Sequence, residues 1–129
     1  MIVIFHNPAC ETSRNVLAFI RAAEEPVVIP YLETGWTRAQ LLALFAAAGV
    51  TARQALRLSG TPAAELGMTD PGVTDETLIS AMVAHPILVN RPFVVTPLGT
   101  RLCRPSETVI PLLPRPTGPL TKEDGTTVG

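Results

Sequence analysis

Residues 2–29 read IVIFHNPACETSRNVLAFIRAAEEPVVI, and this stretch decides the fold. The runs at residues 2–5 and 27–29 are short and rich in β-branched side chains, which is typical of buried strands. Between them, Thr12 or Ser13 can cap a helix. The apolar side chains of that helix recur at helical spacing, at Val16, Leu17, Ile20 and Ala23. A crossover of this length favours a parallel, right-handed β-α-β unit.

The sequence predicts helices over about residues 37–85. Thr37 and Thr51 each precede a Gln by three residues, which is the spacing of a capping box at a helix N-terminus. Thr61 is followed by Pro, which predicts the start of a short helix, and Thr74 predicts another. We interpret this region as a helical insertion between two groups of strands.

Strands return after this insertion. Residues 87–89 and 93–95 are apolar, and residues 100–103 follow a Pro-Leu-Gly turn that favours antiparallel pairing. Ser106 can then cap a last helix. The order β-α-β, helical insertion, β-β-α predicts an α/β class of fold, a thioredoxin-like mixed sheet with helices on its faces.

The domain organisation follows from this order of elements. Residues 1–114 are expected to form one thioredoxin-like domain that contains the helical insertion. Residues 115–129 are polar and broken by Pro and Gly, which predicts a flexible tail. At 47% hydrophobic, a chain of 129 residues is long and apolar enough to bury a core.

Charge and hydropathy argue against several classes of function. The formal net charge is -1, so no overall basic field recruits nucleic acid or anionic lipid. The longest apolar run, residues 41–50, is about half the ~20 residues that a membrane-spanning helix needs. No basic region precedes the apolar residues 2–5, as a signal peptide would require. We therefore expect a cytoplasmic protein with reduced thiols and with no nucleic-acid or membrane partner.

The basic residues are unevenly distributed between the two types: nine of the ten are Arg, and only Lys122 is Lys. Codon bias explains such an imbalance. The alternative is that some of these planar guanidinium groups grip an oxyanion, a task for which Arg and Lys are not interchangeable. Composition alone leaves both interpretations open.

Cys10 lies in the turn from the first strand into the first helix. The free backbone N–H groups of a first helical turn point toward such a position, and the helix dipole favours negative charge there. Thiols in this setting commonly have a pKa lowered to roughly 3.5–7.5, and the same N–H groups can hold an oxyanion. The pattern predicts a reactive thiolate beside an anion site. A small buried cysteine without a chemical role is the alternative.

The neighbours of Cys10 narrow the type of thiol chemistry. Ser13 stands where a dithiol oxidoreductase carries its second Cys, so a Cys-x-x-Cys disulfide cannot form. An outside thiol or the distant Cys103 must then resolve any covalent adduct. A phosphatase-type loop needs Arg six positions after the nucleophile, where this chain has Val16. His and Cys do not cluster at ligand spacing, so we expect no metal site.

Residues 6–15, HNPACETSRN, resemble the active-site signature of the glutathione/glutaredoxin-dependent arsenate reductases, the ArsC family. The similarity continues in order through YLET at 31–34, LR at 56–57, HPILVNRP at 85–92 and VVTPLGTRLCRP at 94–105. It covers roughly residues 2–113 almost without gaps, which is far more than one short motif.

The resemblance implies a role for each matching residue. Cys10 matches the nucleophile that attacks arsenate, and His6 and Ser13 match residues that help to stabilise its thiolate. Pro92 matches a cis-proline that faces the active-site loop. The arginines that surround the arsenic oxyanion match Arg57, Arg91 and Arg104. Spacing alone does not show that these three side chains converge on one thiol.

The resemblance also implies the reaction and its partners. Arsenate is reduced to arsenite, glutathione is the co-substrate, glutaredoxin is the protein partner, and no tightly bound cofactor or metal takes part. We expect a monomer. Position 11 departs from the signature, because Glu11 replaces the usual Gly. A carboxylate there opposes thiolate formation and repels an oxyanion, unless it points into solvent that screens it.

Two alternatives of other classes stay open. One is an Spx-like regulatory protein that contacts RNA polymerase. Such proteins carry a Cys-x-x-Cys switch, which Ser13 removes here. The other is a glutathione-dependent thiol-transfer enzyme of the same superfamily that does not act on arsenate.

Overall fold

The computed structural model describes all 129 residues and contains two compact units. The first consists of Met1–Pro30 and Arg91–Gly129, and the second of Tyr31–Asn90. Sequence analysis expected an insertion over about residues 37–85, so the second unit is wider than that insertion at both ends. None of the helices is both long and apolar enough to cross a membrane.

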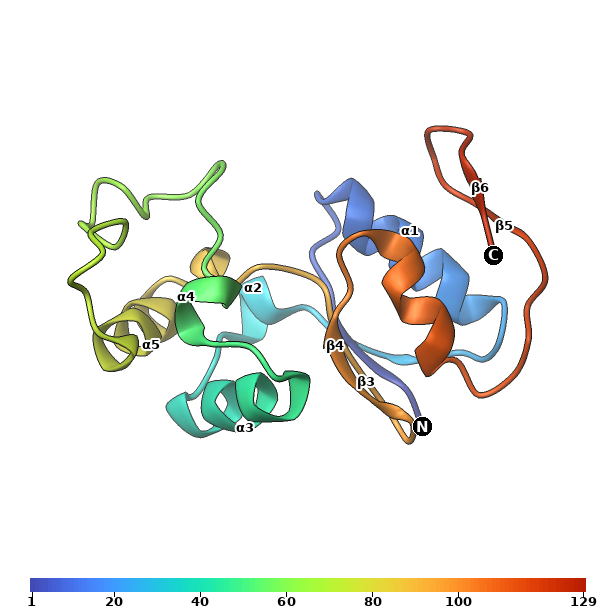
Figure 1. Cartoon of the computed structure of the whole chain (residues 1–129), viewed down its shortest axis with the longest axis horizontal. Helices are drawn as coiled ribbons and strands as arrows, with labels where there is room; N and C mark the ends of the chain where they lie inside the picture. Colours follow the sequence, from blue (N-terminus) through green and yellow to red (C-terminus); the bar gives the residue numbers. More distant parts are fainter. The chain divides into compact units, whose positions relative to one another are not determined.

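The first unit is built on a four-stranded mixed sheet of order β2-β1-β3-β4 (Figure 1). Strand β1 (Val3–Phe5) pairs in parallel with β2 (Val27–Ile29) and antiparallel with β3 (Phe93–Thr96). Strand β3 then pairs antiparallel with β4 (Gly99–Leu102). The predicted parallel β-α-β unit and the returning antiparallel pair are both confirmed, and together they give the thioredoxin-like order.

Helix α1 (Glu11–Arg21) packs beside the 3-10 helix η2 (Ser106–Leu112), and both contribute to the core on one face of the sheet. The fully buried side chains of this core come mainly from β1 and the residue before it, from α1, from β3 and from η2, and include Ile2, Ile4, Val16, Ile20, Val94 and Val109. Burial of such side chains is the main term that holds the sheet and α1 together. The start of α1 is thereby fixed near the end of β1, which pairs with the start of β3.

The second unit contains four α-helices and one 3-10 helix, with bounds α2 (Tyr31–Thr34), α3 (Arg38–Ala48), α4 (Ala52–Ala55), α5 (Asp75–Ala84) and η1 (Pro86–Leu88). The capping boxes predicted at Thr37 and Thr51 are both present, each with its reciprocal Gln contact. Thr74 caps α5 by accepting the Thr77 N–H. The sequence pattern therefore located the N-termini of α3, α4 and α5.

Four local predictions were wrong. Ser106 does not cap the last helix, because Pro105 is the N-cap of η2 and η2 has no side-chain cap hydrogen bond. The segment after Thr61 consists of turns, although the Thr61 hydroxyl accepts the Ala63 N–H at 3.3 Å as a cap would; the same hydroxyl also donates to the carbonyls of Arg57 and Leu58. Residues 87–89 form no strand, because the chain closes a 3-10 turn in which the Leu88 N–H donates to the His85 carbonyl. Cys10, two residues before the expected cap, is the N-cap of α1.

The composition of residues 115–129 predicts a flexible tail, whereas the structure contains a hairpin there. Its strands are β5 (Leu120–Thr121) and β6 (Thr127–Val128). Lys122 pairs with Glu107 at 2.8 Å, and Glu123 pairs with Arg14 at 2.8 Å. These two pairs attach the hairpin to η2 and to α1, and neither was visible in the composition.

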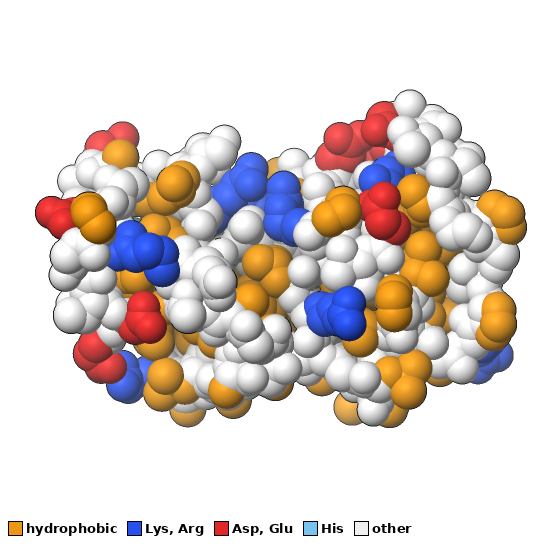
Figure 2. Space-filling model, viewed as in Figure 1, with side chains coloured by type: hydrophobic (Ala, Val, Ile, Leu, Met, Phe, Trp, Pro, Cys, Tyr) orange, Lys and Arg blue, Asp and Glu red, His pale blue; other side chains and the backbone are white.

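Charged side chains of both signs are scattered over the face of the molecule that Figure 2 shows. This distribution agrees with the formal net charge of -1. Any cationic environment for a substrate must therefore be local, made by a few arginines that the fold brings together.

Candidate active site

Cys10 ends a tight loop between β1 and α1. The Asn7 side-chain oxygen accepts the Ala9 N–H at 3.0 Å, and the Asn7 carbonyl accepts the Cys10 N–H at 3.1 Å. Asn7 is itself buried, so this turn is a fixed part of the fold. The turn leaves Cys10 with extended backbone angles (φ -99, ψ 121) at the N-cap of α1, as the predicted location of the thiol requires.

The Cys10 sulfur is surrounded by donors. Burial raises the pKa of the thiol, but the backbone N–H of Ser13 and the side chains of Arg91 and Arg104 outweigh burial and lower the pKa from 9.0 to about 7. Arg104 Nη1 lies 3.7 Å from Cys10 Sγ. At neutral pH about half of the Cys10 population is therefore thiolate, which is the nucleophilic form.

Arg91 and Arg104 reach the sulfur from two adjacent loops of the sheet. Arg91 precedes β3, and Arg104 follows β4. Arg104 Nη1 also donates to the Arg91 carbonyl at 3.0 Å, and the Cys103 N–H donates to the Pro92 carbonyl at 2.8 Å. These two bonds hold the loops together. The antiparallel pairing of β3 and β4 is thus the reason that the two arginines, 13 residues apart, meet at one thiol.

The peptide bond between Arg91 and Pro92 is cis, as the resemblance implies, and so is the bond between Arg104 and Pro105. The structure thus brings two of the three expected arginines to the sulfur. Their role as oxyanion ligands stays a prediction.

Arg57, the third expected arginine, belongs to the second unit. It follows α4, and its backbone N–H donates to the Leu88 carbonyl at 2.7 Å. Its Nε donates to the Ser59 carbonyl at 3.3 Å. Contact of Arg57 with an oxyanion at Cys10 stays a prediction from the resemblance.

Ser13 serves the sulfur through its main chain. Its N–H belongs to the first turn of α1 and helps to lower the pKa of Cys10. The Ser13 hydroxyl is fully buried and has no hydrogen-bond partner. Support of the thiolate by this hydroxyl stays a prediction from the resemblance.

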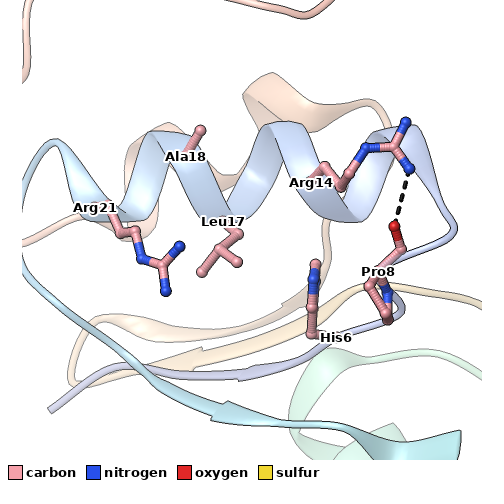
Figure 3. Close-up of a pocket in the computed structure, with 6 residues that line it drawn as sticks. All are labelled: His6, Pro8, Arg14, Leu17, Ala18 and Arg21. Atoms are coloured by element: carbon pink, nitrogen blue, oxygen red, sulfur yellow. Dashed lines mark hydrogen bonds between the residues drawn. The ribbon is translucent and has the colours of Figure 1, made fainter.

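His6 lines a pocket beside α1 together with Pro8, Arg14, Leu17, Ala18 and Arg21 (Figure 3). The pocket has a volume of about 510 Å³. Burial lowers the pKa of His6, and the nearby Arg21 and Arg14 lower it further. His6 is therefore neutral at pH 7, and its Nδ1 is buried without a hydrogen-bond partner. A neutral ring offers the thiolate no charge, so any support from His6 must come through hydrogen bonding or packing.

Two other residues bear on the chemistry. Glu11 is exposed on the first turn of α1, so solvent screens its effect on the thiol. Cys103 is fully buried in the core, and burial raises the pKa of its thiol to about 12. Cys103 is therefore inert as a nucleophile at neutral pH. No group of three or more His, Cys, Asp or Glu side chains is placed to hold a metal ion.

Sequence reasoning assigned no role to Arg14, although Arg14 lies within the signature. Its guanidinium donates to the Pro8 carbonyl in the thiol loop and to Glu123 in the C-terminal hairpin. The only sequence signal was its position one turn after Cys10, where a long side chain can reach back over the loop.

The mixed sheet with a cysteine at the start of α1 and two arginines at its sulfur places the chain in the class of thioredoxin-like α/β proteins. Comparisons identify the family within this class. The model of the ArsC family matches residues 5–111, and the chain belongs to that family.

The relatives are similar along nearly their whole length. An arsenate reductase of Rhizobium meliloti (strain 1021) is 60% identical over 98% of this chain and 92% of its own. An arsenate reductase of Escherichia coli (strain K12) is 54% identical over 96% of this chain and 89% of its own. The solved structure of an arsenate reductase from Vibrio cholerae has a TM-score of 0.81 at 37% identity, covering 87% of this chain and 97% of that one.

Proposed function

We propose that this chain is an arsenate reductase that converts arsenate to arsenite at Cys10. Membership of the ArsC family and relatives named arsenate reductase support this function. The observation that carries the proposal is the environment of the Cys10 sulfur, whose pKa is lowered to about 7 with Arg104 Nη1 at 3.7 Å. A nucleophile beside fixed cationic donors suits an oxyanion substrate.

In the first step, the Cys10 thiolate donates an electron pair to arsenic and forms a sulfur–arsenic bond. One arsenic–oxygen bond breaks, and the leaving oxygen takes up protons and departs as water. The guanidinium groups of Arg91 and Arg104 neutralise the oxygens that remain on arsenic. Arg57 completes this set of ligands in our proposal.

The second step reduces As(V) to As(III) and needs two electrons, which thiols supply as they form a disulfide. We propose that glutathione attacks the arsenic of the Cys10 adduct and displaces a second oxygen as water. A glutaredoxin thiolate then attacks the glutathione sulfur, so that a glutaredoxin–glutathione disulfide forms, this sulfur–arsenic bond breaks and its electron pair stays on arsenic as As(III). Water finally replaces the Cys10 sulfur on arsenic, so that arsenite leaves and the Cys10 thiol is restored. Two features favour an external thiol. Position 13 is Ser, so Cys10 has no neighbouring thiol, and Cys103 is fully buried with its pKa raised to about 12. No metal or tightly bound organic cofactor enters this scheme.

The remaining parts of the proposal concern context. We propose a monomer that works in the cytoplasm, where glutathione keeps thiols reduced. Its partners are arsenate, glutathione and glutaredoxin, and nucleic acid and membranes are not among them. The absence of a Cys-x-x-Cys pair argues against an Spx-like redox switch.

A coupled assay tests the function. Arsenate is added to the protein with glutathione, glutaredoxin, glutathione reductase and NADPH, and NADPH consumption and arsenite are both measured. We expect arsenate-dependent turnover in the wild type, none in Cys10→Ser, and wild-type turnover in the control Cys103→Ala. Turnover that persists in Cys10→Ser contradicts the mechanism. Reduction of glutathione mixed disulfides without any effect of arsenate favours the thiol-transfer enzyme. Recovery of RNA polymerase in a pull-down, together with no arsenate turnover, favours the Spx-like regulatory protein.

A further inference from the structure

The C-terminal hairpin is fastened to the first turns of α1 by Glu123. Its carboxylate accepts two bonds from the Arg14 guanidinium, from Nε at 2.8 Å and from Nη2 at 3.0 Å. Its backbone N–H donates to the side-chain oxygen of the buried Asn15 at 2.9 Å. Both contacts join residues more than 100 positions apart in the sequence. The partners of Glu123, Arg14 and Asn15, lie in the helix that begins directly after Cys10. Two parallel bonds from a planar fork fix the orientation of the guanidinium.

The same guanidinium also holds the thiol loop. Arg14 Nη1 donates to the Pro8 carbonyl at 2.9 Å, and Figure 3 shows this bond. Pro8 lies two residues before Cys10. A continuous series of hydrogen bonds therefore runs from the hairpin, through Arg14, to the loop that carries the thiol. The Glu123 carboxylate and the Pro8 carbonyl accept hydrogen bonds from three different N–H groups of the planar Arg14 guanidinium. Because the guanidinium is rigid, its two bonds to Glu123 also orient the N–H group that donates to Pro8.

A second ion pair on the same helix provides a comparison. Arg21 pairs with Glu25 at 3.1 Å, four residues away, and both side chains are exposed. That guanidinium makes no hydrogen bond to the thiol loop. The Arg14–Glu123 pair differs because its guanidinium has a second acceptor in that loop. Exposed ion pairs alone contribute little to stability, so a role for Glu123 must come from what it orients.

We propose that Glu123 is a positioning residue for Cys10, acting through Arg14 on the Pro8 carbonyl. This inference rests on Cys10 being the reactive thiol of the proposed function. Without Glu123, the Arg14 side chain is free to turn toward solvent and the loop loses its donor. The Cys10 sulfur then spends less time against the Ser13 N–H and the arginines that favour its thiolate.

The test measures the rate of Cys10 alkylation by iodoacetamide as a function of pH in wild type, Glu123→Ala, Arg14→Ala and the double variant. The matched control is Glu25→Ala, which removes the carboxylate from the other arginine pair of α1. We expect Glu123→Ala to move the alkylation midpoint to higher pH and to slow alkylation at pH 7 by about two- to threefold. The control keeps the wild-type profile. The double variant is alkylated no more slowly than Arg14→Ala, because Glu123 acts only through Arg14 and has no further effect once Arg14 is removed.

Two results would overturn the proposal. A midpoint that moves to lower pH in Glu123→Ala means that the unpaired Arg14 cation acts on the thiol by charge alone. A lowered melting temperature with an unchanged alkylation profile means that the hairpin serves stability alone. Alkylation needs no arsenate, so this test can fail while arsenate turnover persists. Conversely, absence of arsenate turnover in the wild type defeats the proposed function and leaves the alkylation result standing.

Discussion

Replacing Arg104 with Met removes a charged donor from the Cys10 sulfur while keeping much of the aliphatic stem. Arg104 Nη1 lies 3.7 Å from that sulfur and 3.0 Å from the Arg91 carbonyl. The substitution therefore takes away one of the donors that lower the pKa of Cys10 and also releases the loop that carries Arg91. We expect the pKa of Cys10 to rise from about 7 toward its ordinary value of 9.0.

The size of the effect follows from the thiolate fraction. At a pKa of about 7, half of the thiol is ionised at pH 7. The Ser13 N–H and Arg91 lower the pKa more than Arg104 does, so only part of the lowering is lost. For a rise of about one unit in the pKa, the ionised fraction at pH 7 falls to roughly a tenth and alkylation by iodoacetamide slows about fivefold. Loss of an oxyanion ligand reduces kcat/KM for arsenate further, by about 100-fold.

The control for this experiment is Arg101→Met, which removes the same charge from an exposed position on β4. The alkylation profile of that variant stays at the wild-type midpoint, because the effect of Arg104 requires contact. The reasoning is refuted if Arg104→Met alkylates at the wild-type rate across the pH range, or if Arg101→Met shows an equal change.

Three further predictions concern stability. The pKa of Cys10 is lowered on folding, so the free energy of unfolding of the wild type relative to Cys10→Ser rises between pH 7 and 9, by on the order of 1–2 kcal/mol. Urea titrations at several pH values measure this difference. A difference that stays flat or falls with pH contradicts the prediction. The pKa of His6 is also lowered on folding, so as the pH falls the unfolded chain binds this proton before the folded chain does. The free energy of unfolding therefore falls as the pH drops below 6.5. His6→Gln makes this decrease with falling pH smaller, and an unchanged decrease excludes His6 as its source. Thr37→Ala removes the capping box of α3 and lowers the free energy of unfolding by about 1 kcal/mol, measured by urea denaturation against the exposed substitution Thr69→Ala. Equal effects of the two substitutions refute the role of the cap.

Much of the first unit could be predicted from local patterns. Short β-branched runs identified β1, β2 and β3, and the length of the connection between the first two implied parallel pairing. The position of Cys10 between β1 and α1 predicted a lowered pKa before any contact was known, and the structure gives that direction. These predictions worked because each depends on residues that are close in the sequence.

The parts that could not be predicted depend on long-range contacts. The sulfur meets Arg104 across 94 positions of sequence, and only the pairing of β3 with β4 brings Arg104 and Arg91 into one place. The hairpin at the C-terminus is polar and rich in turn residues, so its composition resembles that of a flexible tail. It is attached by Leu120 and Val128, which pack against the core, and by polar contacts such as Arg14–Glu123; these isolated contacts leave no periodic signal in the sequence.

Some errors were local competitions that sequence patterns describe poorly. Thr61 has the appearance of a helix cap and accepts the Ala63 N–H, yet its hydroxyl also bonds back to the carbonyls of Arg57 and Leu58 and the chain continues in turns. Pro86 precedes an apolar run typical of a strand, but the chain closes a 3-10 turn there, and Val89 keeps only a single bridge to Leu56. In both cases side-chain or backbone hydrogen bonds within the loop accompany a conformation that the local sequence pattern did not predict.

One titration decides most directly whether Cys10 is a thiolate at neutral pH. The absorbance of the thiolate near 240 nm is followed from about pH 5 to 10 in the wild type, and the same curve for Cys10→Ser is subtracted. Cys103 is common to both proteins and stays protonated over this range, because its pKa is about 12. A difference curve with its midpoint at about 7 agrees with the donors at the sulfur. A midpoint near 9 would mean that Ser13, Arg91 and Arg104 do not activate the thiol.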